Sequence, residues 1–380
     1  MRKRLLVSIT SMIMVFMMST MMVFADSTIE GNMTSAEFLA NSNEQGIITL
    51  SQDTTLVDAL KVDAQNYIID LNGHTLKFTK DTNLVTNNAN VTFKNGSINL
   101  DGIKGSSDCI LGVGSYGSSA TLTLDRVNLQ ANNYTSPYAL IYVYNQSTLN
   151  IQNNSVINAK NERSLSGGVI KTSNGSAGKI NVINSTLNFE NAARGFVDGT
   201  INIIGSTVQM KGLNNGINSS SGGLNLTVDN SKLAISGCLG RALTVDGSNI
   251  TVKNNSVLDF SNSLTADIQF KSQGKIDVDK SSDLNFKTVK VDKAVTNAGI
   301  ELNDLIVSEK YDYELDANGS VNKACKHANV IITNAKEATC TEEGYTGDKV
   351  CSDCNEVIEN GTTTPVLSHE FEDGKCVHCG

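Results

Sequence analysis

The sequence of 380 residues lacks the features of several common protein classes. No Ser/His/Asp arrangement and no phosphate-binding loop is present, so no signature of a nucleophilic hydrolase or nucleotide-binding enzyme is found. A positive charge excess is also missing, and the net charge of −9 argues against nucleic acid as a partner. Tryptophan is absent, proline occurs only 2 times, and aromatic residues make up 5%, so any cluster of aromatic side chains stands out.

Long apolar runs are confined to the first residues of the chain. Arg2, Lys3 and Arg4 precede this run, and Val23-Phe24-Ala25 fits a small-residue cleavage site. Residues 1–25 are therefore predicted to be a secretory signal peptide, and the mature chain is predicted to have no membrane span. The alternative is an uncleaved membrane anchor, because the run is about long enough to cross a bilayer. No cysteine follows the run and no sorting motif or apolar tail closes the sequence, which argues against a lipoprotein or a wall-sorted protein.

An eight-residue unit recurs nine times between Ile69 and Asp283. It reads apolar, polar, apolar, any, turn residue, any, any, apolar, and 26 of the 27 residues at positions one, three and eight are apolar. The exception, Asp283, lies next to Leu284 and indicates a one-residue slip. The eighth position, predicted to point inward like the first and third, is Leu76, Ile98, Leu129, Val156, Leu187, Val208, Leu233 and Val257 in the other units.

The unit predicts a short strand, a sharp bend and the start of a second strand. Positions one and three alternate with short polar residues, which is typical of a strand with one buried face. Position five is Asn or Gly in seven of the nine units, and these residues most readily adopt a left-handed backbone. Stacked units bury an apolar column that no single unit could bury. A leucine-rich repeat has similar spacing but is excluded, because no Leu-rich consensus or recurring helical segment fills the gaps.

The regions around the array predict its ends. Residues 26–305 are assigned to the parallel β-helix and its N-terminal cap, since Thr34 and Glu37 form a capping-box pattern for a short covering helix. Residues 306–323, with Asn318-Gly319 as a turn, are predicted to be a closing hairpin or linker. Residues 324–380 form a Cys/His-rich module. The fold class is therefore all-β, a β-solenoid with a small C-terminal module.

Two stretches resemble known families. Residues 70–76, Asp-Leu-Asn-Gly-His-Thr-Leu, resemble the opening rungs of right-handed parallel β-helix proteins of the pectate-lyase-like fold. Residues 338–354, with Cys340, Cys351 and Cys354, resemble Cys-rich, zinc-ribbon-like repeats on exported proteins of anaerobic Gram-positive bacteria. The first resemblance implies a fold that enzymes and adhesins share. The second implies a secreted or cell-surface location.

The C-terminal module holds six of the 8 cysteines and three of the 4 histidines. Two CxxC pairs predict metal ligands, because a CxxC turn aims both thiolates at one ion. Eight ligands make two Cys3His sets for two structural zinc ions: Cys325, His327, Cys340, Cys351, Cys354, His369, Cys376 and Cys379. One partition joins Cys340 and His327 with Cys351 and Cys354, and another exchanges the two histidines. Three disulfides are the alternative to zinc in an exported protein.

Evidence for catalysis in the sequence is weak. β-Helix lyases and hydrolases use several acids on neighbouring rungs, and the outward strand positions show no such run. Asp277 and Asp279 form the single candidate pair, at a spacing compatible with inverting hydrolysis. A solvated turn is the plainer interpretation of these two acids.

The three longest gaps between units are consecutive and predict one cluster of protruding loops. Five tyrosines concentrate there, and Tyr116, Tyr134 and Tyr138 are the candidate ligand-binding residues, since exposed tyrosine rings stack on sugars. Core packing is the alternative role for these rings. The sequence thus favours a non-catalytic, adhesin-like protein that binds glycans or a cell-surface component. A polysaccharide lyase or glycoside hydrolase acting on polyuronides is the alternative function.

Overall fold

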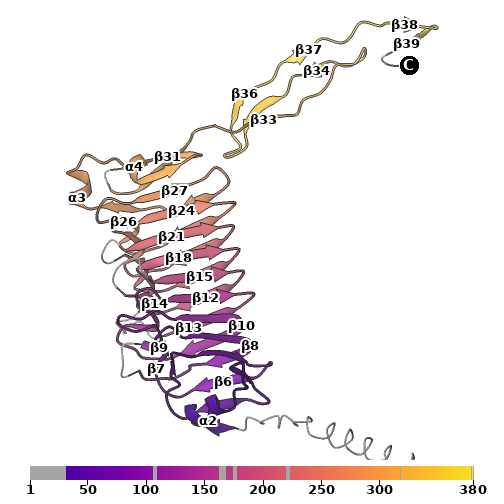
Figure 1. Ribbon diagram of the computed structural model, residues 1–380. Coiled ribbons are helices and arrows are strands. Elements are labelled where there is room, and N and C mark those ends of the chain that lie inside the picture. The colour runs from indigo at the N-terminus through magenta and orange to yellow at the C-terminus, as the bar shows by residue number, and fades with distance from the viewer. Residues whose placement is uncertain are drawn as a thin grey trace, which may run out of the picture.

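The protein is a parallel β-solenoid followed by a narrow ribbon of antiparallel strands (Figure 1). The computed structural model describes residues 31–105, 109–161, 168–173, 178–219, 223–316, 318–377 and 379. The predicted signal peptide lies outside them. Each turn of the solenoid contributes strands to three faces, and every strand pair between neighbouring turns is parallel. The prediction of an all-β parallel solenoid is confirmed.

The first face carries positions one to three of each repeat unit. Its strands are β2 (Ile47–Thr49), β5 (Asn66–Asp70), the first halves of β8 (Asn90–Asn99) and β10 (Thr121–Asn132), β12 (Thr148–Gln152), β15 (Lys179–Ile183), β18 (Gly199–Ile204), β21 (Leu224–Asp229), β24 (Asn249–Lys253), β27 (Lys275–Val278) and β30 (Ile306–Ser308).

The second face follows each bend and carries position eight. Its strands are β1 (Asn32–Met33), β3 (Thr54–Leu56), β6 (Thr75–Phe78), the second halves of β8 and β10, β13 (Val156–Lys160), β16 (Thr186–Glu190), β19 (Thr207–Lys211), β22 (Lys232–Ser236), β25 (Val257–Ser261) and β28 (Asp283–Asn285).

The third face is a separate sheet of 10 strands, and it closes the cross-section. Its strands are β4 (Val62–Asp63), β7 (Thr82–Thr86), β9 (Cys109–Val113), β11 (Ala139–Val143), β14 (Gly168–Thr172), β17 (Arg194–Val197), β20 (Asn215–Asn218), β23 (Arg241–Val245), β26 (Ala266–Phe270) and β29 (Val289–Val291).

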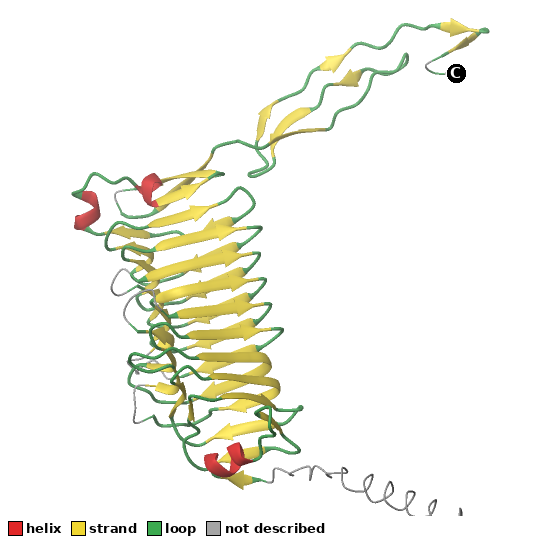
Figure 2. Ribbon diagram, in the orientation of Figure 1, coloured by secondary structure: helices red, strands yellow, loops and turns green. Residues whose placement is uncertain are grey.

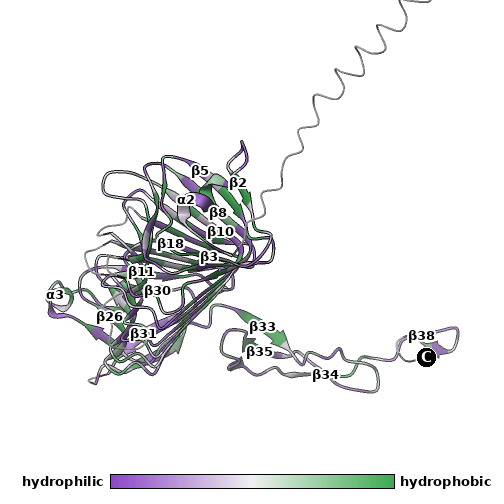
Figure 3. Ribbon diagram, turned by 90° about the horizontal axis from the view of Figure 1, so that it is seen from below, coloured by the Kyte–Doolittle hydropathy of each residue, from purple (hydrophilic) through white to green (hydrophobic). Residues whose placement is uncertain are grey.

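The apolar column predicted from the repeat runs through the whole solenoid. All 18 residues at unit positions one and three are buried and belong to one continuous core cluster, while the polar residues between them stay half-buried. Figure 3, coloured by hydropathy, shows hydrophobic and hydrophilic residues intermixed along the stacked strands. The bends also follow the prediction, because position five has a positive φ in eight units, from Gly73 (84°) to Asn254 (57°). Asparagine and glycine tolerate that conformation at low cost.

Two residues predicted to point inward point outward instead. Val156 and Val257 are half-buried on the outer surface, and their neighbours Ile157 and Leu258 are fully buried in the column. In these units the bend has five residues between inward positions rather than four. Two consecutive asparagines with positive φ, such as Asn153 and Asn154, accommodate the extra residue. The slip predicted at Asp283 has the same form, because Leu284 is the buried residue.

A buried serine column lines the same bends. The backbone N–H of Ser185 donates to Ser206 Oγ (3.0 Å), that of Ser206 to Ser231 Oγ (3.0 Å), and that of Ser231 to Ser256 Oγ (3.1 Å). Each hydroxyl in turn lies near a backbone carbonyl oxygen, as Ser206 Oγ does at 3.1 Å from Val182 O. The column satisfies backbone groups that the bend removes from the strand ladder.

Both ends of the solenoid are covered (Figure 2). Helix α2 (Ser35–Ala40) begins with the predicted capping box of Thr34 and Glu37 and buries Phe38 against the first rung. At the other end lie α3 (Lys293–Thr296), α4 (Leu302–Leu305) and the hairpin of β31 (Tyr311–Leu315) and β32 (Val321–Cys325). Within the described residues, no helix is both long and apolar enough to cross a membrane.

The C-terminal ribbon extends away from the solenoid beyond this hairpin (Figure 1). Its strands are β33 (Val330–Thr333), β34 (Gly344–Tyr345), β35 (Asp348–Cys351), β36 (Val357–Glu359), β37 (Thr363–Thr364), β38 (Phe371–Glu372) and β39 (Lys375–Cys376). Many of its apolar side chains are exposed, among them Ile332 (63%) and Phe371 (71%). The ribbon therefore has little core of its own, and other interactions must hold it together.

Candidate functional site

The eight ligands predicted in the C-terminal module gather into two groups of four. The proximal cluster, next to the solenoid, consists of Cys325, His327, Cys351 and Cys354. The distal cluster, near the tip of the ribbon, consists of Cys340, His369, Cys376 and Cys379. In each cluster the four ligand atoms lie within 4.8 Å of one another, so each cluster could hold one metal ion.

Strand pairing assembles the proximal cluster. Cys325 ends β32, and the antiparallel pairing of Val330 with Cys351 returns the first CxxC pair to the same place. The Sγ atoms of Cys325 and Cys351 are 3.6 Å apart, and Cys354 Sγ lies 3.5 Å from His327 Nδ1. The backbone N–H of His327 points at Cys325 Sγ (3.4 Å).

The distal cluster forms where the ribbon ends. The backbone N–H of Leu367 donates to Thr339 O (2.9 Å), which brings His369 close to Cys340. His369 Nδ1 is 3.4 Å from Cys376 Sγ and 3.7 Å from Cys379 Sγ, and Cys376 Sγ is 3.8 Å from Cys340 Sγ.

Both partitions of the ligands expected from the sequence are wrong in the same respect. Each placed Cys340 with the first CxxC pair and Cys325 with the second, whereas the structure exchanges these two cysteines. The reason is the register of β33 and β35, which carries Cys340 past the pairing and toward the tip. The register of these strands cannot be inferred from the spacing of the cysteines along the chain. Among the described residues, which include all eight cysteines, no two cysteines are joined by a disulfide.

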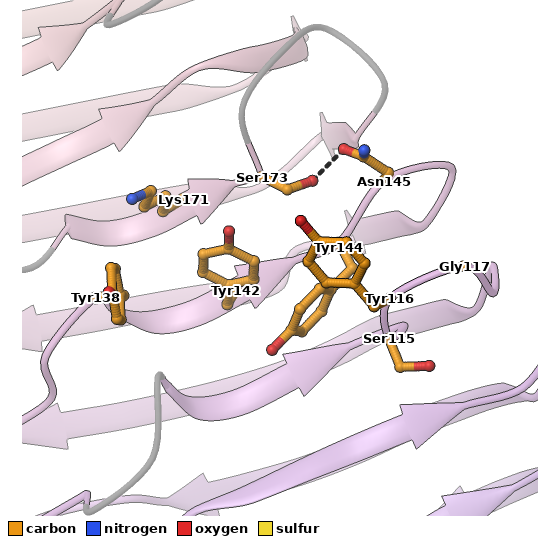
Figure 4. A pocket seen from close by; sticks show the side chains of 9 residues that line it. All are labelled: Ser115, Tyr116, Gly117, Tyr138, Tyr142, Tyr144, Asn145, Lys171 and Ser173. Carbon is orange, nitrogen blue, oxygen red and sulfur yellow. Dashed lines mark hydrogen bonds between the residues drawn. The ribbon is translucent and has the colours of Figure 1, made fainter.

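The second candidate site is a pocket on the outer surface of the third face, over β9, β11 and β14 (Figure 4). We call it the tyrosine pocket. It encloses about 390 Å³ and is lined by Ser115, Tyr116, Gly117, Tyr138, Tyr142, Tyr144, Asn145, Lys171 and Ser173. The loops lie within the three long gaps of the repeat, as the sequence predicted.

Strand alternation presents the tyrosines. Ile141 and Val143 of β11 are fully buried, so Tyr142 and the next residue after the strand, Tyr144, project outward. Their ring centroids are 4.6 Å apart at an interplanar angle of 59°. Tyr116 on a loop is fully exposed and Tyr138 is 48% exposed, which makes both accessible to a ligand.

Lys171 gives the tyrosine pocket its charge. Its Nζ lies 4.9 Å from the ring centroid of Tyr138 and 5.8 Å from that of Tyr142. Ser173 donates a hydrogen bond to Asn145 Oδ1 at the far side, as drawn in Figure 4. The nine lining residues include no carboxylate, so the pocket offers aromatic faces, hydroxyls, one amide and one cation.

Tyr134 was predicted to share this surface, and that prediction is wrong. Its side chain is only 3% exposed, and burial raises the pKa of its hydroxyl, although a hydrogen bond with Asn161 acts in the opposite direction. Tyr134 therefore packs in the core. Tyr142 alternates with the apolar residues Ile141 and Val143, whereas the sequence around Tyr134 shows no such alternation. This difference distinguishes the two tyrosines in the sequence.

The acidic pair at the end of the array is engaged in structural contacts. Asp277 Oδ1 pairs with Lys275 Nζ at 2.7 Å. Asp279 lies past the end of β27 and accepts from the backbone N–H of Asn254 (2.8 Å) and from Ser281. Burial alone would raise the pKa of Asp279, but these hydrogen bonds outweigh it and hold the pKa below its usual range.

Together the fold and the sites define a parallel β-solenoid that carries two Cys3His clusters and an aromatic surface pocket. Comparisons with protein-family models, with curated proteins and with solved structures found no match for this chain. The function is therefore argued from the geometry of these sites alone.

Proposed function

We propose that this protein is an exported, surface-displayed β-solenoid that binds glycans in the tyrosine pocket without cleaving them. The observation that carries the proposal is the pocket itself, with four tyrosine rings gathered on and beside strand β11 in a chain with few aromatics. Tyrosine provides flat apolar area at a low entropic cost, together with a hydroxyl that can hydrogen-bond a sugar.

The size and chemistry of the tyrosine pocket support a sugar ligand. Its volume of about 390 Å³ falls in the lower part of the range of small-molecule sites. Tyr116 and Tyr138 are its two exposed rings, at opposite ends of the pocket (Figure 4), while Ser115, Asn145 and Ser173 supply hydroxyl and amide groups. A pyranose ring has an apolar face for stacking and hydroxyls at its edge, which matches this division.

The same geometry supports binding over catalysis. Glycoside hydrolysis requires two carboxyl groups about 5–10 Å apart around the scissile bond. The lining residues of the tyrosine pocket include none, and the Asp277 carboxylate is paired with Lys275. A lyase or hydrolase of polyuronides remains the alternative function, and incubation with polygalacturonate tests it directly.

We also propose that both Cys3His clusters bind zinc. With Zn–S bonds of about 2.3 Å and Zn–N bonds of about 2.0 Å, a tetrahedral ion separates two thiolates by about 3.8 Å and a thiolate from an imidazole nitrogen by about 3.5 Å. The Sγ–Sγ distance is 3.6 Å for Cys325–Cys351 and 3.8 Å for Cys340–Cys376, three Sγ–Nδ1 distances are 3.4 to 3.7 Å, and all ligand atoms of a cluster lie within 4.8 Å of one another. Zinc fits these ligand types and would hold together a ribbon that has little core.

Export rests on the sequence pattern of residues 1–25. A location on the surface of a Gram-positive bacterium rests on the resemblance of the C-terminal module to repeats of exported proteins. Both are proposals that mass spectrometry of the protein in its native host would test, by locating it and identifying its first residue. A mature chain beginning at Asp26 is expected.

The binding proposal is tested with a glycan array probed by the purified mature chain. The variant Tyr116→Ala/Tyr138→Ala removes two accessible rings that the core does not need, so its thermal stability should match the parent. It should lose most glycan binding. Leu264→Ala is the control, because Leu264 is an apolar side chain that is 79% exposed and does not line the pocket. Loss of binding in this control would show that the pocket is not the site.

A further inference from the structure

The proximal cluster draws its ligands from two parts of the molecule. Cys325 is the last residue of β32, whereas Cys351 is the last residue of β35 in the ribbon, and Cys354 lies in the turn that follows. A single ion bound by these ligands would tie the hairpin to the base of the ribbon. The distal cluster lies entirely within the ribbon and can only tie parts of the ribbon to each other.

The hairpin that supplies Cys325 is firmly joined to the last solenoid turn. Tyr313 is 2% exposed, and its ring packs against Phe286 with a centroid distance of 5.3 Å. Its backbone N–H donates to Asn303 Oδ1 (2.8 Å), and the backbone N–H of Val321 donates to Lys287 O (2.9 Å). Cys325 is therefore part of a hairpin that is fixed to the solenoid.

Polar contacts join the two parts directly, among them an ion pair of Lys326 Nζ with Asp312 Oδ1 (3.1 Å). The hydroxyl of Tyr311 donates to the backbone carbonyl of Asp353 (3.2 Å), inside the CxxC turn of the proximal cluster. The Nζ atom of Lys326 donates to Ser308 O (2.8 Å) and so holds the chain just before His327. Partly buried hydrogen bonds of this kind contribute about 1 kcal/mol each, which is too little to fix a ribbon of this length.

His327 has a partner that His369 lacks. The Nδ1 atom of His327 faces Cys354 Sγ at 3.5 Å, and its Nε2 atom lies 3.5 Å from Glu356 Oε2. A carboxylate behind a metal-binding histidine fixes the tautomer and the ring orientation, so that the other nitrogen is free to bind the ion. In the described part of the distal cluster, His369 stacks instead on Phe371, with ring centroids 5.9 Å apart, and pairs with no carboxylate.

We propose that the proximal cluster is a metal-held joint between solenoid and ribbon, in which Glu356 is a positioning residue for His327. This proposal rests on the proposed zinc binding, and in it the two ions have different roles. The proximal ion binds more tightly and sets the position of the ribbon, and the distal ion closes its tip. Loss of the distal ion leaves the junction intact.

The role of Glu356 is tested by zinc affinity in the full mature chain. Cys376→Ser disables the distal cluster, so that competition with a chelator reports the proximal site alone. In that background Glu356→Ala should weaken zinc binding about 10- to 100-fold, and Glu356→Gln, which keeps an acceptor for His327, should recover part of it. Glu359→Ala is the control, because Glu359 pairs with Lys349 at 2.6 Å on the ribbon surface.

Cobalt in place of zinc gives a second readout. The absorption bands of a Co²⁺ ion held by three thiolates and one imidazole depend on ligand geometry, so Glu356→Ala should shift or broaden them and Glu359→Ala should not. A surface role of Glu356 in stability alone would leave the bands unchanged. Equal affinity and equal spectra in Glu356→Ala and the parent would overturn the positioning role.

The joint itself is tested by hydrogen exchange of the hairpin amides in β31 and β32. Cys351→Ser should speed their exchange in the presence of zinc, while Cys376→Ser should leave it unchanged. Equal exchange in both variants would overturn the joint while leaving zinc binding in place. A parent chain that binds no metal would instead refute the proposed zinc sites, and the joint with them.

Discussion

The sharpest stability test asks which of two neighbouring residues points inward after each longer bend. Ile157 is fully buried in the apolar column, and its neighbour Val156 is half-buried on the outer surface. The Ile157→Ala substitution removes three buried carbons, a loss of about 2.4 kcal/mol at about 0.8 kcal/mol each. A cavity that closes incompletely adds to this, so the expected total is about 2–5 kcal/mol. Val156→Ala should cost less than about 1 kcal/mol, because its side chain meets solvent.

The measurement is urea unfolding followed by far-UV circular dichroism, comparing the two neighbouring variants with the parent. Ile157→Ala should lower the midpoint clearly, and Val156→Ala should leave it almost unchanged, with similar slopes. Leu258→Ala and Val257→Ala repeat the comparison at the second long bend, where Leu258 is the buried member. If the two members of each pair cost the same, or if the outward valine costs more, the assignment of the bends is wrong.

The remaining predictions address the serine column, the metal clusters and catalysis. Ser206→Ala should cost about 1–3 kcal/mol in urea unfolding, because it leaves the buried N–H of Ser185 without its acceptor, whereas the outward Thr207→Ala should be nearly neutral. A strong chelator should abolish the ordered amide signals of the ribbon in NMR spectra and preserve the solenoid's strand signal in circular dichroism, while loss of both or of neither would contradict a separately metal-folded ribbon. Incubation with polygalacturonate and Ca²⁺ should produce neither unsaturated nor reducing ends, and if either forms, Asp277→Asn/Asp279→Asn is the first variant to assay.

The solenoid could be predicted from the sequence because its determinants are local. Alternation of apolar and polar residues fixes which side chains point inward, and asparagine or glycine at the bend fixes where the strand turns. The two misassigned valines follow a bend that is one residue longer, where an apolar outward residue resembles an inward one. The buried serines would have marked the phase, because Ser155 and Ser185 each stand two residues before the inward residue that follows them.

The candidate sites were predictable only in part, because they depend on contacts distant in sequence. The types of the metal ligands are evident from their spacing, but the exchange of Cys325 and Cys340 depends on the register of β33 and β35. Lys171 belongs to the tyrosine pocket through the parallel pairing of β11 with β14, which places it beside Tyr142. The pairing of these two strands cannot be predicted from any motif in the sequence. The partnership of Glu356 with His327 was likewise visible only in three dimensions.

The central claim, glycan binding in the tyrosine pocket, is tested most directly by calorimetric titration of the best glycan from the array into three proteins. The parent and Leu264→Ala should bind it with equal affinity, and Tyr116→Ala/Tyr138→Ala should bind it at least tenfold more weakly while melting at the parent's temperature. Equal affinity of all three proteins, or no glycan bound by the parent at all, would contradict the claim.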